Sequence, residues 1–218
     1  MILPGSVDLG HRESDTAVMK RATRLATAMC VAAALLYVGP VAHPVLAADT
    51  PSGVPSTWVR KAPGGWVYWV PTKKWTDKHS KCGIDISSPT GTMLVGLGAG
   101  PLPVPMDTRQ AFAAIVDAYE RDEGLSGVSV IQEYPVVDSA GEQTQSFLVR
   151  GQRAIAGKPP VAVTAMISVG VLTLAGGYGI EASVVLAPTK EWKKQAKTLG
   201  LILKNVMMIE TDCLSPAS

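Results

Sequence analysis

The chain has 218 residues, of which 47% are hydrophobic and 17% are charged, and its formal net charge is +2. These values are ordinary for a globular protein, so they exclude a disordered or fibrous chain.

The segment from residue 19 to residue 47 has the parts of a secretory signal peptide in order: a basic start, an apolar stretch and small residues at a cleavage site. We predict cleavage after Ala47, with residues 1–18 as an upstream extension. The alternative is an uncleaved anchor, because the uncharged run from Leu25 to Ala48 is long enough to span a bilayer. With the signal removed, we expect no membrane span and a secreted or cell-envelope location, as in exported bacterial proteins.

Removal of this segment changes the numbers of charged residues, histidines and cysteines in the mature chain. Behind Ala47 the chain has 16 Lys and Arg against 15 Asp and Glu, so net charge predicts neither a nucleic-acid partner nor attraction to an anionic membrane. His79 is the one histidine left, which excludes a multi-histidine metal site within one chain. We predict no metal and no cofactor. Cys82 and Cys213 are the cysteines left, and such a pair in an oxidising compartment predicts a disulfide.

Residues 48–63 are rich in Pro, Gly and Ser and are predicted to be a flexible linker. A single domain follows over residues 64–213. Its first strand is the aromatic and β-branched run 64–71. Residues 83–87 alternate between apolar and polar, and a turn with Pro and Gly joins them to a third strand over 92–97.

A helix is predicted to begin after Asp107, because Asp107 with Gln110 three residues later is a capping-box variant. One apolar stripe follows at helical spacing, formed by Phe112, Ile115, Val116 and Tyr119. Gly124 is the expected end of this helix.

Four further strands are predicted from apolar runs bounded by turns, over 128–137, 146–156, 160–174 and 178–186. Thr189 is then expected to cap a last helix. Its predicted buried stripe consists of Trp192, Ala196, Leu199, Leu203 and Val206. The lysines of this helix are interpreted as a solvated face, and Gly200 is expected to let the helix pack close to the sheet.

This order of elements, with short turns between neighbouring strands, indicates the α+β class. We predict an antiparallel β-sheet of about six or seven strands with two amphipathic helices packed on it. Both helices can cover one face of the sheet.

Several places in the chain resemble the PsbP-like family, which is named after an extrinsic accessory protein of photosystem II. They are the strand that opens with Gly65 and Trp66, the hairpin at 84–91, the helix after Asp107, and the closing pattern 177–192. Small secreted bacterial proteins of unknown function look similar. The resemblance covers residues 64–208. It implies an accessory or binding module without shared catalytic residues, and it carries over no site residues.

Two constellations have an ordinary structural interpretation. The glycine-rich run 96–101 is followed by prolines and has no Lys, so we expect small residues beneath a closely packed helix and not a phosphate loop. Asp77, His79 and Cys82 contain the groups of an activated thiol or a metal site. The disulfide would remove that thiol, and the flanking lysines favour a solvated loop.

The best functional lead is a set of tryptophans interleaved with cations near the start of the domain. Trp69, Trp75, Lys73 and Lys74 are the candidate binding residues, because aromatic groups beside cations can stack on sugars or bind anionic polymers. The alternative is a core role. One face of the first strand must be buried, and an exposed opposite face would mark an interaction site.

We therefore predict a secreted or envelope-associated, non-enzymatic accessory or binding protein. Its partner would be an envelope protein or a polysaccharide. Two alternatives stay open: an enzyme of unrecognised type that uses the His79 and Cys82 region, and a purely structural surface protein.

Overall fold

The structure is a computed structural model, and it describes residues 51–139, 141–174, 176–208 and 212–214. The predicted upstream extension, the predicted signal peptide and the first three residues of the predicted linker lie outside this part. Among the helices of the described residues, none is long and apolar enough to cross a membrane.

The described residues form eleven strands, two α-helices and one turn of 3-10 helix. The strands are β1 (Val59–Lys61), β2 (Trp66–Val70), β3 (Thr76–His79), β4 (Gly83–Ser87), β5 (Leu94–Leu102), β6 (Leu125–Glu133), β7 (Val137–Ser139), β8 (Glu142–Ile155), β9 (Lys158–Leu174), β10 (Gly177–Pro188) and β11 (Met207–Met208). The helices are α2 (Thr108–Asp122), α3 (Trp192–Lys204) and the 3-10 turn η1 (Asp212–Leu214).

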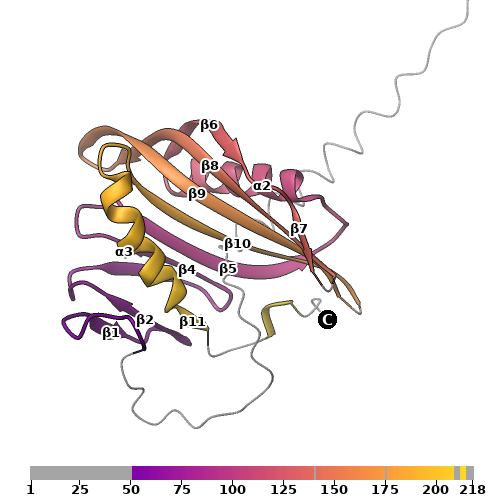
Figure 1. The fold of residues 1–218 in the computed structure, drawn as a ribbon, viewed down its shortest axis with the longest axis horizontal. Coiled ribbons are helices and arrows are strands. Elements are labelled where there is room, and N and C mark those ends of the chain that lie inside the picture. The colour runs from indigo at the N-terminus through magenta and orange to yellow at the C-terminus, as the bar shows by residue number, and fades with distance from the viewer. Residues whose placement is uncertain (1–50, 140, 175, 209–211, 215–218) are drawn as a thin grey trace, which may run out of the picture.

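The strands form a large and a small antiparallel sheet (Figure 1). The eight-stranded sheet has the order β3-β4-β5-β10-β9-β8-β6, with β7 paired to β8. The three-stranded sheet has the order β1-β2-β11. The predicted α+β class is confirmed, with more strands than the six or seven expected.

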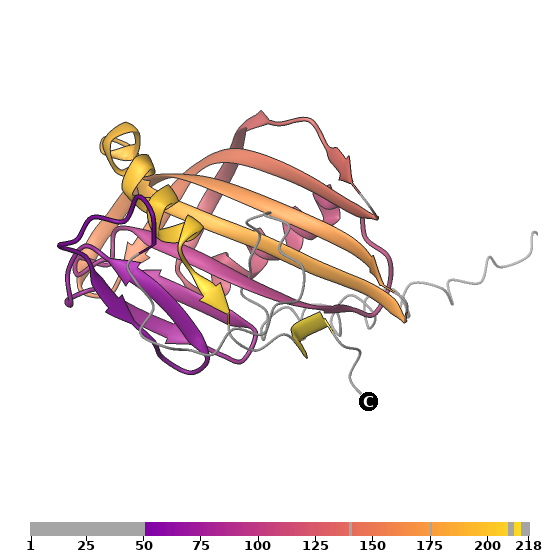
Figure 2. The same ribbon diagram turned by 60° about the horizontal axis from the view of Figure 1, so that its bottom comes forward.

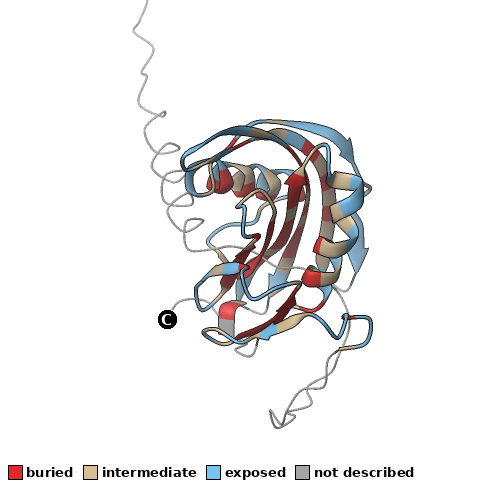
Figure 3. Ribbon diagram, turned by 90° about the vertical axis from the view of Figure 1, so that its left-hand side faces the viewer, coloured by how far each residue is buried: buried red, intermediate tan, exposed pale blue. Residues whose placement is uncertain are grey.

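The two helices lie on opposite faces of the large sheet, so the expectation that both cover one face is wrong (Figure 3). Alternate residues of β10 divide between two cores: Val184 packs with Ile115 of α2, whereas Ala187 packs with Leu199 of α3. Strand β5 is buried on both faces over most of its length. A continuous apolar run is what a strand covered on both sides requires, and the sequence of β5 has that run.

The predicted side-chain cap is present at the start of α2 and absent at the start of α3. Asp107 caps α2 through the predicted capping box, in which Gln110 N–H donates to Asp107 at 2.7 Å. Helix α3 begins instead after Glu191, which makes no side-chain cap, so the expectation of a cap by Thr189 is wrong. Thr189 accepts a hydrogen bond from the Thr164 hydroxyl, which attaches the start of α3 to β9. A methyl group at Gly200 would meet no atom within 4 Å, so close packing there is wrong as well.

Part of the predicted linker belongs to the fold. Residues 59–61 form β1 and pair with β2, and the preceding segment packs Val54 and Trp58 against Trp69 (Figure 2). Burial of Val54 and partial burial of Trp58 outweigh the local preference of a Pro-rich and Gly-rich segment for flexibility.

The sequence predicts a solvated loop at residues 75–82. The residues of β3 in this segment are mostly exposed, but they form a strand that pairs with β4 at the edge of the large sheet. The turn after β3 leads to Cys82. As predicted, Cys82 is joined to Cys213 in η1, and their Cα atoms lie 5.4 Å apart. The disulfide connects the start of the fold to its C-terminal turn.

Candidate functional site

Trp69 and Trp75 are buried, with 2% and 4% of their surfaces exposed. Of the two interpretations of these tryptophans, the structure therefore supports the core role, and the first strand has no exposed aromatic face. The small sheet is covered on both sides: Trp66, Tyr68 and Trp75 pack toward α3 and the large sheet, while Trp69 is covered by the segment before β1.

The predicted cations remain at the surface. Lys73 and Lys74 are exposed in the loop between β2 and β3. The guanidinium carbon of Arg60 lies 6.0 Å from the ring centroid of Trp69, at the distance of a cation–π contact. The ammonium group of Lys61 donates to the carbonyl oxygen of Trp75, which places β1 beside this loop. We call Arg60, Lys73 and Lys74, together with Trp69, which Arg60 contacts, and Trp75, which follows Lys74 in the chain, the tryptophan-backed surface.

The candidate catalytic region is a hydrogen-bonded chain. The Tyr68 hydroxyl donates to Asp77 Oδ1 at 2.5 Å, and Nδ1 of His79 lies 2.8 Å from Asp77 Oδ2. Burial first, and then the contact with Asp77, raise the pKa of Tyr68 well above its ordinary value, so its phenol stays a neutral donor. Cys82 is held in the disulfide, so its thiol is not available as the nucleophile that this region would need. Within the described residues, no group of three or more His, Cys, Asp or Glu could hold a metal ion.

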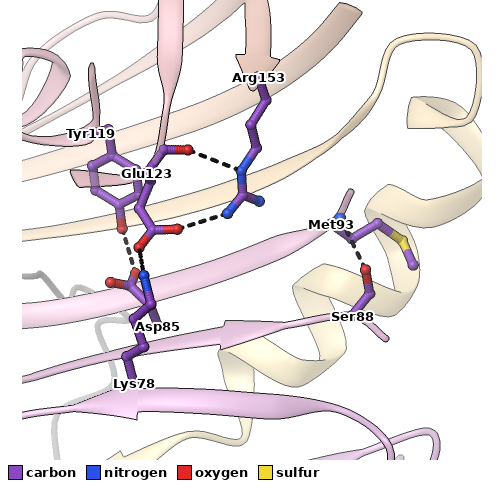
Figure 4. Close-up of polar contacts among 7 residues, drawn as sticks. All are labelled: Lys78, Asp85, Ser88, Met93, Tyr119, Glu123 and Arg153. Atoms are coloured by element: carbon purple, nitrogen blue, oxygen red, sulfur yellow. Dashed lines mark hydrogen bonds and ion pairs between the residues drawn. The ribbon is translucent and has the colours of Figure 1, made fainter. Parts of the chain in front are cut away.

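An ion network that the sequence did not indicate links β3 to the end of α2 and to β8 (Figure 4). Lys78 Nζ lies 2.6 Å from Glu123 Oε1, and Arg153 Nη2 lies 2.7 Å from Glu123 Oε2. The pKa of Lys78 is raised above its ordinary value, because the effect of the hydrogen bond to Glu123 is larger than that of desolvation, which lowers the pKa. Arg153 is buried, and its Nη1 has no hydrogen-bond partner among the described residues. The carboxylate of Glu123 therefore provides most of the interaction that offsets the burial of the Arg153 charge. These three residues come from β3, the end of α2 and β8, and no sequence spacing relates them.

The glycine-rich run contributes packing space, as predicted. A methyl group at Gly96 would lie 1.9 Å from the Tyr119 hydroxyl, which donates to Asp85 Oδ1 at 2.8 Å (Figure 4). Strand β5 therefore uses a glycine where α2 approaches the sheet.

Most of the cations lie in two segments of the chain. Segments 59–81 and 190–204 contain 11 Lys and Arg against two acidic residues, Asp77 and Glu191, whereas residues 82–189 contain five against ten. Both basic segments pack on one hydrophobic cluster, in which Trp66 and Tyr68 of β2 meet Leu199 of α3. The net charge of +2 conceals this uneven distribution of charge along the sequence. Counting the charges segment by segment is a signal that could have indicated the two basic segments.

A scan against protein-family models and a search of curated proteins found no match for this chain. Solved structures with a similar fold include cyanobacterial PsbP (CyanoP) from Synechocystis sp. PCC 6803, with 10% identity and a TM-score of 0.42, covering 74% of this chain and 98% of that one. The Ran-binding protein Mog1p of Saccharomyces cerevisiae has 16% identity and a TM-score of 0.41, covering 72% of this chain and 97% of that one. LpqN of Mycobacterium tuberculosis, described as involved in cell envelope biogenesis, has 14% identity and a TM-score of 0.35, covering 70% and 91%. A PsbP protein is thus among the solved structures to which this chain is similar.

Proposed function

We propose that this chain is a secreted or envelope-associated, non-enzymatic accessory protein that binds an envelope protein or polysaccharide. The observation that carries the proposal is the tryptophan-backed surface. Lys73 and Lys74 are exposed, and Arg60 is held over Trp69. The buried rings fix the backbone from which these cations project, so less side-chain and loop entropy is lost on binding an anionic partner.

The disulfide supports an extracytoplasmic location, because such bonds persist in oxidising compartments. It also weighs against the alternative of a thiol enzyme at Cys82. N-terminal sequencing of the exported protein tests the location, with a mature start at Ala48 as the expected result. Recovery of the whole protein in the cytoplasm would contradict it.

The binding proposal is tested by capture of partners from envelope extracts with the wild-type protein and with Lys73→Gln/Lys74→Gln. The expected result is a loss of the partners recovered by the wild type. Arg121→Gln/Arg150→Gln is the matched control, because both arginines are exposed on other elements and the same two charges are removed. Trp69→Ala is unsuitable, because truncation of a buried tryptophan costs about 3–5 kcal/mol of stability.

If the wild type and Lys73→Gln/Lys74→Gln recover the same partners, the tryptophan-backed surface is not the binding site. If the wild type recovers no partner, the result favours the alternative of a purely structural surface protein.

A further inference from the structure

Helix α3 presents five lysines on the side away from its core. They are Lys190, just before the helix, and Lys193, Lys194, Lys197 and Lys204, all exposed. At 100° per residue the four lysines within the helix fall within an arc of about 100°, and from Lys193 to Lys204 they extend about 16 Å along the axis. We call these five residues the lysine stripe.

The lysine stripe is not neutralised by the rest of the described protein. Among the residues that the structure describes, none of the five takes part in an ion pair, and Glu191 is the one acidic residue within the segment. The opposite side of α3 holds Leu199 and Ile202, which are fully buried in the core. The helix is therefore fixed in orientation by its apolar face, and its charged face is left for an external anion.

The charge on the other helix has the opposite sign. Helix α2 and its two capping positions carry five acidic residues against two arginines. One of these acids, Glu123, is already paired with Lys78 and Arg153. Helices α2 and α3 lie on opposite faces of the large sheet (Figure 3), so the helix with more acidic residues and the helix with more lysines are on opposite sides of the sheet. Near a flat anionic surface, such a distribution turns α3 toward that surface and α2 away from it.

We propose that the lysine stripe docks the protein on a membrane surface rich in anionic lipid. Clusters of four to eight basic residues on an amphipathic helix are the pattern that anionic lipid surfaces attract, at about fivefold in affinity per residue. The stripe consists of lysines, which act as point charges without the fixed fork of arginine, and this suits a mobile layer of headgroups. Among the described residues no tryptophan is fully exposed: Trp66, Trp69 and Trp75 are buried, and Trp58 and Trp192 are partly buried. Stacking on sugar rings needs an exposed aromatic face, so a polysaccharide is the less favoured occupant.

Vesicle sedimentation with the full chain tests the proposal. The vesicles are phosphatidylcholine alone, or phosphatidylcholine with one third phosphatidylglycerol. The readout is the ratio of binding to the two kinds, so that any contribution of the apolar segment 25–48, common to both, cancels. Expected are preference for the anionic vesicles at about 0.05 M salt and its loss at about 0.5 M, since salt screens charges at a surface.

Two variants decide whether the lysine stripe is responsible. Lys193→Gln/Lys197→Gln should weaken binding to anionic vesicles about 25-fold. Arg121→Gln/Arg150→Gln removes the same net charge elsewhere and should change binding less than threefold. Circular dichroism should show both variants folded.

Three results would overturn the proposal. The first is equal binding to both kinds of vesicle, and the second is an equal loss in the two variants. The third is displacement of the protein from vesicles by a soluble acidic polysaccharide at equal charge concentration. Lys73→Gln/Lys74→Gln should keep at least a third of the vesicle binding, so failure of this proposal is distinguishable from failure of the partner-binding proposal.

Discussion

The hydroxyl of Tyr119 reaches Asp85 across the space that a glycine leaves open, and the two side chains form a 2.8 Å hydrogen bond inside the protein. A methyl group at Gly96 would occupy this space, 1.9 Å from the Tyr119 oxygen and 2.5 Å from Asp85 Oδ1. Both partners are buried, so neither can turn to solvent without leaving a polar group unpaired.

Gly96→Ala is therefore expected to lower the free energy of unfolding by about 3 kcal/mol, through overpacking and loss of this hydrogen bond. Urea denaturation measures it. Gly200→Ala is the matched control, because it adds the same methyl group where no atom lies within 4 Å, in an exposed part of α3. It should stabilise the protein by about 0.5–1 kcal/mol. A Gly96→Ala variant at least as stable as the wild type would contradict the packing described for β5.

Glu123→Ala should be strongly destabilising, by about 3–5 kcal/mol, because it leaves the guanidinium of Arg153 buried without its compensating carboxylate. Lys78→Ala removes the other partner of Glu123. The Lys78 side chain is 74% exposed, so the loss should stay below about 1 kcal/mol. Chemical denaturation of both variants gives the comparison. Equal losses would mean that Arg153 does not depend on Glu123.

Glu181→Gln should change how stability depends on pH. Burial, and then the nearby charge of Glu142, raise the pKa of Glu181 to about 7. The unfolded value is about 4.3, so between these values the folded protein binds more protons, and the free energy of unfolding falls as pH rises.

Thermal unfolding at pH 4 and pH 8 measures this dependence. At pH 8 Glu181→Gln should be more stable than wild type by about 1–2 kcal/mol, after allowance for screening by solvent. At pH 4 the variant and the wild type should agree. Glu142→Gln should give a smaller gain at pH 8, because burial, the larger cause, remains. A wild type that becomes more stable from pH 5 to pH 7 while the variant does not would reverse the sign and refute the assignment.

Loss of the disulfide should cost about 2–5 kcal/mol, because Cys82 and Cys213 are separated by 131 positions and the bond constrains a long loop in the unfolded chain. Denaturation of Cys82→Ser/Cys213→Ser measures the cost. A reductant should destabilise the wild type by the same amount and leave the double variant unchanged. Thiol labelling of the native protein followed by peptide mapping is the direct check, and a labelled Cys82 would contradict the bond.

Local chemistry in the sequence predicted features that depend on a few neighbouring residues. The capping box of Asp107 and Gln110 places the start of α2, because both hydrogen bonds lie within one turn. The alternation of β4 and its turn predicted a hairpin with β5, which the structure has. The pairing of Cys82 with Cys213 followed from counting what remains after the predicted signal is removed.

Burial of the candidate tryptophans depended on partners outside their own strand and loop. Alternation along β2 predicts which face of the strand Trp69 lies on. It does not predict that Val54 and Trp58 cover that face. Strand β3 pairs with β4 although its own residues are mostly exposed. In both cases hydrophobic burial or a backbone ladder from another element outweighed the local preference.

The sequence by itself determined the α+β class, the capped first helix, the disulfide pair and a chain with almost no net charge. Only the tertiary structure decided where the charges and aromatic groups lie. It places α2 and α3 on opposite faces of one sheet, buries Trp69 and Trp75, and brings segments 59–81 and 190–204 onto one core. The physical reason is that periodicity and capping act over a few residues, whereas the direction of a side chain is set by whichever distant element covers its face.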